Sequence, residues 1–262
     1  MEFYTLASSS GGNAALVRHG GTAVLLDAGI SARRITQALA ALGLTPGELE
    51  GLLITHEHSD HVSGVATLCK KYGVPVYASR GTAYFLSERA AGCLRIFEAG
   101  DAFSLGNFQV RSFRTSHDAA DSVDYRLDCA GGSFGALTDT GVITAEAAAL
   151  LPGVDILLLE SNHDVEMLSS GPYPYPLKQR ILGERGHLSN EAAAEFALRC
   201  AREGTGDILL AHLSAENNTP ELAEYAVGRT LQAAGCALRL GVAPRDRLSE
   251  VHIPASRRGG AA

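Results

Sequence analysis

The chain has 262 residues, of which 46% are hydrophobic and 19% charged, a composition that excludes a disordered, collagenous or coiled-coil protein. Its 22 lysines and arginines against 29 aspartates and glutamates give a net charge of −7, so no positive field over the whole surface attracts nucleic acid or an anionic membrane. A polyanionic ligand would have to be held by a local site.

Short apolar runs, many of them ended by Gly, Asp or His, recur along the chain and predict strands. They cover residues 14–17, 22–26, 51–55, 75–78, 108–114, 155–159 and 207–211. Amphipathic stretches between them predict helices that begin near Ser31, Asp60, Ser189 and Thr219, where Pro220 would take the first helical position.

The segment 103–137 differs, because it shows alternation of apolar and polar residues, Gly-rich turns at 106–107 and 131–132, and no helix signal. It predicts a block of antiparallel strands. Strands and helices mixed in this way favour two sheets with helices outside. No linker divides the chain, so we expect one domain over 1–254 and a disordered tail at 255–262, which is small, basic and Gly-ended.

The densest group of chemically active side chains is Thr55-His56-Glu57-His58-Ser59-Asp60-His61, between a predicted strand and a predicted helix. In an extended segment, residues i and i+2 point the same way, so His56 and His58 can bind one cation. Asp60 and His61 open the helix and can turn toward a second. Such nitrogen and oxygen ligands suit Zn²⁺, Mn²⁺ or Fe²⁺, and a solvated polar loop is the alternative.

Further candidate ligands lie where predicted strands end. His117 follows 108–114, Asp139 follows an apolar run ending at residue 138, and His212 follows 207–211. Each alone would more often be an ordinary polar residue. Together they favour convergence on one metal site.

With these residues in this order, the chain resembles the metallo-β-lactamase superfamily, whose signature is H-x-H-x-D-H followed by a His, an Asp and a final His. The resemblance implies an α/β fold, an αββα sandwich of two mixed β-sheets with helices on the outer faces. It also implies two divalent metal ions per chain: His56, His58 and His117 would hold the first, Asp60, His61 and His212 the second, and Asp139 would bridge them.

Longer motifs are similar to the WalJ/YycJ-type branch of that superfamily. They are Ser8-Ser9-Ser10-Gly11-Gly12-Asn13, Leu159-Glu160-Ser161-Asn162-His163-Asp164, Gly171-Pro172-Tyr173-Pro174, Gly186-His187-Leu188-Ser189-Asn190-Glu191 and Ala211-His212-Leu213-Ser214-Ala215-Glu216-Asn217-Asn218. The branch implies a phosphodiesterase, a 5′-to-3′ exonuclease that acts on DNA rather than RNA, by attack of metal-activated hydroxide on phosphate. No obligate protein partner is indicated.

His187 resembles the phosphate-binding or proton-donating histidine of related nucleases. It precedes a helix that Ser189 is expected to cap, a position that favours contact with an anion. We expect it to protonate the leaving oxygen, and a surface histidine is the alternative. His187 and Asp60 are the expected catalytic residues.

Other residues have weaker signals. Asp27 follows a strand and either accepts a hydrogen bond from a ligand imidazole or is an ordinary turn residue. The loop 8–13 resembles an anion nest or a plain turn. Lys178, Arg180 and Arg185 either contact phosphates or form a solvated face. The expected substrate-binding residues are Ser10, Asn13, Asn162, His163, Lys178 and Asn217.

Three rival functions use the same residues. A hydrolase of small substrates with this fold, such as a cyclic phosphodiesterase, thioesterase or lactonase, needs the same ligands and a closed pocket. A diiron redox or sensor protein would have a metal-dependent visible spectrum. A binding protein with a structural metal would have closed coordination.

The compartment is inferred from the cysteines and the N-terminus. The sequence Met1-Glu2-Phe3-Tyr4-Thr5 has neither the basic nor the apolar segment of a secretory signal, and no apolar run approaches the ~18 residues of a membrane span. The cysteines are odd in number, widely spaced and without a C-x-x-C pair, which is typical of reduced thiols. We therefore expect a cytoplasmic protein with no disulfide. The cysteines are Cys69, Cys93, Cys129, Cys200 and Cys236.

Overall fold

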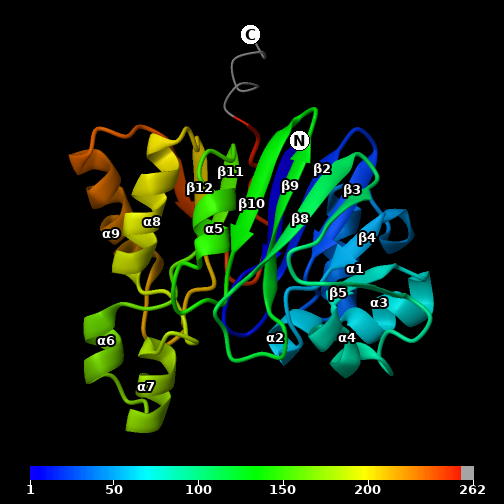
Figure 1. Cartoon of the computed structure of the whole chain (residues 1–262), viewed down its shortest axis with the longest axis horizontal. Coiled ribbons are helices and arrows are strands. Elements are labelled where there is room, and N and C mark those ends of the chain that lie inside the picture. Colours follow the sequence, from blue (N-terminus) through cyan, green and yellow to red (C-terminus); the bar gives the residue numbers. More distant parts are fainter. Residues whose placement is uncertain (255–262) are drawn as a thin grey trace.

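The computed structural model describes residues 1–254, which form two β-sheets packed face to face (Figure 1). The first sheet has the order β1-β2-β3-β4-β5-β6. It is antiparallel from β1 to β3 and parallel from β3 to β6. Its strands are β1 (Glu2–Ala7), β2 (Ala14–His19), β3 (Thr22–Leu26), β4 (Gly51–Leu53), β5 (Val76–Ser79) and β6 (Leu94–Phe97).

The second sheet has the order β13-β12-β11-β10-β9-β8-β7. Strands β7 to β10 are antiparallel, as expected for the segment 103–137, and β10 to β13 are parallel. They are β7 (Ala102–Leu105), β8 (Phe108–Arg114), β9 (Val123–Cys129), β10 (Gly132–Leu137), β11 (Ile156–Glu160), β12 (Asp207–Ala211) and β13 (Arg239–Val242).

Helices cover the outer face of each sheet, and α6 and α7 extend beyond the sandwich (Figure 1). The predicted αββα sandwich is therefore confirmed. The helices beside the first sheet are α1 (Ala32–Ala41), α2 (Ser59–Val62), α3 (Val65–Tyr72) and α4 (Arg80–Leu86), with a 3₁₀ turn at Pro46–Glu48. Those that follow are α5 (Ala145–Leu150), α6 (Val165–Ser170), α7 (Tyr175–Leu182), α8 (Asn190–Arg202) and α9 (Pro220–Ala233).

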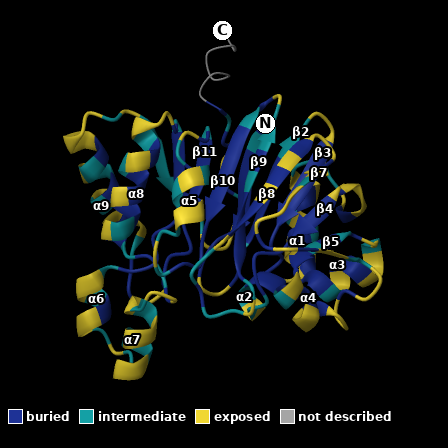
Figure 2. Cartoon of the chain, viewed as in Figure 1, coloured by how far each residue is buried: buried dark blue, intermediate teal, exposed yellow. Residues whose placement is uncertain are grey.

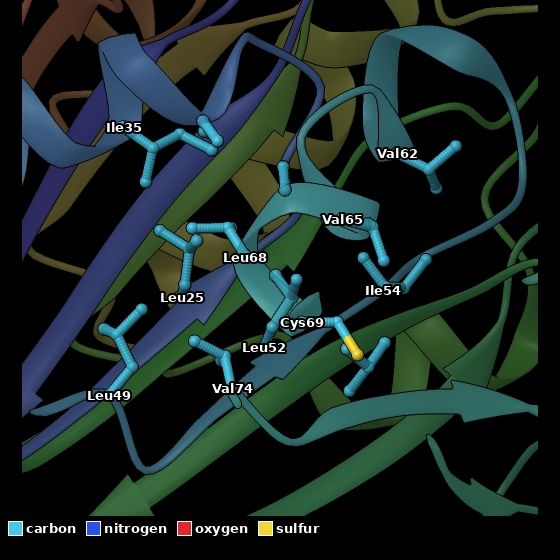
Figure 3. Close-up of a cluster of buried hydrophobic side chains, with 14 of the residues drawn as sticks. Leu25, Ile35, Leu49, Leu52, Ile54, Val62, Val65, Leu68, Cys69 and Val74 are labelled. Carbon is cyan, nitrogen blue, oxygen red and sulfur yellow. The ribbon is translucent and has the colours of Figure 1, made fainter. Parts of the chain in front are cut away.

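Three apolar clusters join these four layers, and burial of apolar surface stabilises each of them. The first joins α1 and α3 to the first sheet, where Leu25 and Leu52 pack near Leu68 (Figure 3). The second lies between the sheets and includes Phe3 and Phe134, whose ring centroids are 4.6 Å apart. The third joins the second sheet to α5, α8 and α9. Figure 2 accordingly shows buried strands between helices with exposed outer faces.

The predicted helix starts are confirmed where a side chain caps the helix. Ser31, Ser189 and Thr219 each accept a backbone hydrogen bond from the first turn of α1, α8 and α9. The helix expected from Asp60 is instead two helices, α2 and α3. The break lies before Val65, because the Gly64 N–H donates to the Ala28 carbonyl at 2.7 Å and leaves the helical ladder.

One expectation about the cysteines is wrong. Cys69 of α3 and Cys93, which precedes β6, form a disulfide across 24 positions of sequence. The fold brings together two cysteines whose spacing gives no sign of pairing. Cys129, Cys200 and Cys236 form no disulfide within residues 1–254.

Among the described residues, no helix is both long and apolar enough to cross a membrane. The tail expected at 255–262 lies outside the described residues.

Candidate metal centre

The candidate ligands follow strands of both sheets and meet at one edge of the sandwich. Asp27 follows β3, the loop 55–61 follows β4, and Asp139 and His212 follow β10 and β12. Within residues 1–254, Asp27, Asp139 and His212 are the only non-glycine residues with positive φ, at 56°, 52° and 56°. Non-glycine residues adopt this left-handed conformation at a cost of about 1–3 kcal/mol each, so its concentration at this edge marks a functional site.

One group of three histidines contains His56, His58 and His117, whose ligand atoms lie within 4.8 Å of one another. His117 Nε2 is 3.3 Å from His58 Nδ1. The other nitrogen of His117, Nδ1, lies 3.1 Å from the Gly186 carbonyl oxygen, which orients the ring.

A second group contains Asp60, His61 and His212, also within 4.8 Å. His61 Nε2 is 3.4 Å from Asp60 Oδ2 and 3.2 Å from Asp139 Oδ2. Asp139 Oδ1 is in turn 3.6 Å from Nε2 of both His117 and His212. Asp139 therefore lies between the two groups: its Oδ1 is near a histidine of each group, and its Oδ2 is near His61 of the second.

Asp27 contacts the His61 nitrogen that is turned away from Asp60 and Asp139. Its Oδ2 is 2.7 Å from His61 Nδ1, and both of its oxygens accept from the Thr55 hydroxyl. The buried carboxylate thus fixes the imidazole so that Nε2 points to Asp60 and Asp139.

The unpaired atoms of the site fit divalent metal ions. His56 Nε2, Asp139 Oδ2 and His212 Nε2 are buried without a hydrogen-bond partner among the described residues. Buried polar atoms normally have partners, and three orphans that converge from different loops indicate a ligand. The mixture of imidazole nitrogens and carboxylate oxygens is the donor set expected for Zn²⁺, Mn²⁺ or Fe²⁺.

The charges of the site compensate one another. Burial alone would raise the pKa of the Asp139 carboxyl, but the imidazoles of His212 and His61 hold that pKa well below its ordinary value. Burial lowers the pKa of His212, yet Asp139 and Asp60 raise it to about 10. In His56, burial and the neighbouring His61 hold the pKa well below 6.5. The protein therefore keeps its acids ionised in a buried place, as cation ligands must be.

Glu160 is the residue that sequence reasoning missed as a functional group. It is fully buried at the end of β11, and its Oε1 lies 2.8 Å from His187 Nδ1 and 3.0 Å from His212 Nδ1. Its Oε2 accepts from the Thr140 N–H at 3.0 Å. One carboxylate thus orients a candidate ligand and the candidate proton donor. The signal was a lone charged residue ending an apolar strand.

A cavity of about 240 Å³ opens at this centre. Of the expected substrate-binding residues, Ser10 and Asn162 line it. Asn162 Nδ2 also donates to the His212 carbonyl at 2.8 Å, which supports the strained backbone there. His187 lines the cavity as well, with 18% of its side chain exposed.

The other expected substrate-binding residues do not line the cavity. Asn13 Nδ2 is 3.2 Å from His61 Nε2, and its Oδ1 accepts from the Ser9 N–H. Lys178 donates to the Ser169 carbonyl. His163 and Asn217 are buried, and neither ring nitrogen of His163 has a partner among the described residues.

Comparisons with known proteins agree with this geometry. The model of the metallo-beta-lactamase superfamily matches residues 9–154. The chain belongs to the metallo-β-lactamase superfamily. It is 41% identical over 239 residues to the exodeoxyribonuclease WalJ of Streptococcus pneumoniae serotype 2, with 89% of each chain covered. It is 38% identical over 240 residues to the exodeoxyribonuclease YycJ of Bacillus anthracis, with 90% of each covered. The expected resemblance to this branch is confirmed.

Solved structures share this fold. The metallo-β-lactamase fold protein YhfI from Bacillus subtilis matches with a TM-score of 0.71 at 15% identity, over 95% of this chain and 100% of that one. Zn²⁺-bound PqqB from Methylobacterium extorquens matches with a TM-score of 0.70 at 19% identity, over the same shares. At these identities the likeness shows the fold alone.

Proposed function

We propose that this metal-dependent nuclease is a dinuclear exodeoxyribonuclease that degrades DNA in the 5′-to-3′ direction. The observation that carries the proposal is the meeting of two ligand groups, Asp139 between them, beside a cavity lined by His187. The exodeoxyribonuclease names of relatives 38–41% identical over most of the chain support the DNA substrate.

The first group, His56, His58 and His117, would hold one ion, and the second, Asp60, His61 and His212, the other. Asp139 would contact both. A pair of divalent ions held there would polarise a phosphoryl oxygen, activate water near neutral pH and stabilise the developing negative charge. The positive charge of such ions would also attract a phosphate locally, despite the net charge of −7.

The chain's own residues then handle protons. Asp60 lines the cavity and is the carboxylate available to accept a proton from the attacking water. His187 holds Nδ1 against Glu160, which leaves Nε2 to donate a proton to the leaving oxygen. Glu160 stabilises the charged imidazolium because the carboxylate is 2.8 Å away and fully buried.

The test is digestion of matched DNA and RNA strands, labelled at the 5′ or the 3′ end, by the purified protein with Mn²⁺ or Zn²⁺. We expect mononucleotide release from the 5′ end of DNA, and slower or no degradation of RNA. Cleavage in the interior of strands, release from the 3′ end or preference for RNA would contradict the proposal.

A further inference from the structure

Three basic residues lie in or just after α7, and the structure gives them different roles. Lys178 donates to the Ser169 carbonyl, and Arg185 donates through Nε and one terminal nitrogen to the His117 carbonyl at 3.1 and 2.9 Å. These two therefore fix the α6–α7 segment. Of the three, Arg180 alone lines the metal-centre cavity.

Arg180 is held in the cavity wall by an acid. Its Nε is 2.6 Å from Asp118 Oδ2, and 55% of its side chain is exposed. Asp118 follows the candidate ligand His117, and Asp118 Oδ1 is 3.4 Å from His117 Nε2. An ion pair exposed to this extent is weak, so a phosphate anion that enters the cavity can compete for the guanidinium.

The surroundings of Arg180 suit the rest of a nucleotide. Leu177 lies three residues before Arg180 and Ile181 one residue after it, so the three side chains share one face of α7. These three residues and Tyr173 line the cavity. Within α7, which the structure describes completely, no residue is buried. Tyr173, Leu177 and Ile181 are only partly buried where they line the cavity, so their aromatic and apolar surface is available to a base or sugar.

The cavity is also small. Its volume of about 240 Å³ lies below the usual range of about 300–1,000 Å³ for ligand sites. A volume of this size is filled by about one nucleotide unit beside the metal centre, and the rest of the substrate lies outside the cavity.

We propose that Arg180 binds the phosphate adjacent to the scissile one, and that Tyr173, Leu177 and Ile181 contact the nucleotide between these two phosphates. The substrate is thus an unpaired DNA end. Before substrate arrives, Asp118 holds the guanidinium in place. When substrate binds, Arg180 exchanges a carboxylate oxygen of Asp118 for a phosphate oxygen. This inference rests on the proposed exodeoxyribonuclease function and adds the structural state of its substrate.

The experiment compares Arg180→Gln with wild type on two substrates: single-stranded DNA, and bis(p-nitrophenyl) phosphate, which has no adjacent phosphate. We expect KM for DNA to rise about 10-fold or more, as for loss of a hydrogen bond to a charged group, with little change in kcat. Hydrolysis of bis(p-nitrophenyl) phosphate should not change. Arg202→Gln, an exposed arginine at the far end of α8, is the matched control and should leave both substrates unaffected.

A modified substrate locates the contact. Replacing the linkage adjacent to the scissile one by an uncharged methylphosphonate should raise KM of the wild type by a similar factor, and should have little further effect in Arg180→Gln. A 5′ end sequestered in a blunt duplex should be degraded more slowly than an unpaired end.

The outcomes separate the inference from the proposed function. A wild type that hydrolyses bis(p-nitrophenyl) phosphate but no DNA overturns the proposed function, and the inference with it. DNA degradation that is equal in wild type and Arg180→Gln overturns the inference alone. Equal losses on both substrates would make Arg180 a structural residue of α7 and would also overturn the inference. Additive effects of Arg180→Gln and the methylphosphonate, or faster degradation of the blunt duplex than of the unpaired end, would overturn it as well.

Discussion

At the scale of single residues, Glu160 separates the roles of two histidines. It contacts Nδ1 of both His187 and His212, but only His212 has its other nitrogen buried without a partner and near Asp60 and Asp139. Both histidines line the cavity, but 18% of the His187 side chain is exposed there against 1% of the His212 side chain. The same carboxylate thus contacts a candidate metal ligand on one side and the proposed proton donor on the other.

We therefore predict that His187→Ala keeps both metal ions and loses turnover by about 10²–10⁴-fold, the usual contribution of a general acid. Metal content by mass spectrometry and kcat on single-stranded DNA check this. Asp139→Ala is the comparison variant, because loss of the carboxylate between the two groups should lower metal content from about two ions toward one or none. Loss of metal from His187→Ala would make His187 a ligand and contradict the prediction.

Glu160→Gln should weaken both turnover and metal binding. The amide has nearly the shape of the carboxylate but lacks its charge, and removal of such an orienting group typically costs about 10–100-fold in metal affinity or activity. We expect kcat to fall and the second metal ion to dissociate more readily in a chelator titration. Glu224→Gln, on the exposed face of α9, is the control. A variant that matches wild type in both measurements would show that Glu160 is a packing residue.

The sequence predicts the candidate ligands more readily than their supports, for a physical reason. Histidines at i and i+2 and acids at strand ends form a pattern along the chain. Glu160, by contrast, acquires its role from His187 and His212, which are 27 and 52 residues away. Only its position at the end of a buried apolar strand hints at it, since a buried charge requires partners.

At the scale of elements, the loops after β1, β3 and β4 are locked together by backbone contacts. The Asn13 N–H donates to the Asp60 carbonyl at 2.8 Å, and the Gly29 N–H donates to the Asn13 carbonyl at 2.7 Å. A Cβ on Gly29 would lie 1.5 Å from the Asp60 carbonyl oxygen, so this contact requires glycine. The position of Asp60 therefore depends on a residue that carries no side chain.

Gly29→Ala is accordingly predicted to displace the Asp60 loop, lower the melting temperature and reduce metal content. Calorimetry and metal analysis check both effects. Gly47→Ala is the matched control, because a Cβ there meets no atom within 4 Å and φ is not positive. If Gly29→Ala bound two metal ions with the wild-type melting temperature, the contact would not position Asp60.

Elements were predictable where their burial pattern is regular. Strands β3, β8 and β12 have the expected bounds, because their apolar runs end at Asp, Thr or His beside the site. Helix α7 is not among the predicted helices, because none of its residues is buried and its apolar face is only Leu177 and Ile181. The break between α2 and α3 was missed because the Ala28 carbonyl that accepts from Gly64 lies far back in the chain.

At the scale of the whole molecule, the disulfide and the metal centre lie in different places. Cys69 belongs to the apolar cluster between the helices and the first sheet, and neither cysteine lines the metal-centre cavity. A cross-link over 24 residues restricts the unfolded chain and contributes about 3 kcal/mol. Reduction should therefore affect stability and not catalysis.

Cys93→Ala should thus lower the free energy of unfolding by about 3 kcal/mol and retain the metal content and kcat of the wild type. Chemical denaturation of the oxidised proteins measures the free energy of unfolding. Cys236→Ala is the control, because it removes a partly exposed thiol that forms no disulfide. A wild type inactivated by dithiothreitol at concentrations that spare the metal would contradict the separation of disulfide and site.

The candidate ligands come from both sheets, and this gives the last prediction. The loop 55–61 follows β4 of the first sheet, whereas His117, Asp139 and His212 follow strands of the second. Ions can be bound by both sets of residues only in the folded protein, because unfolding separates the sheets. At a free concentration of about 1,000 times its dissociation constant, each ion adds about 4 kcal/mol to stability.

We therefore expect a chelator to lower the melting temperature markedly, and Mn²⁺ or Zn²⁺ to restore it. In Asp139→Ala, which loses the carboxylate between the two ligand groups, the chelator should shift the melting temperature less. An equal shift in the two proteins would place the stabilising ion outside this centre.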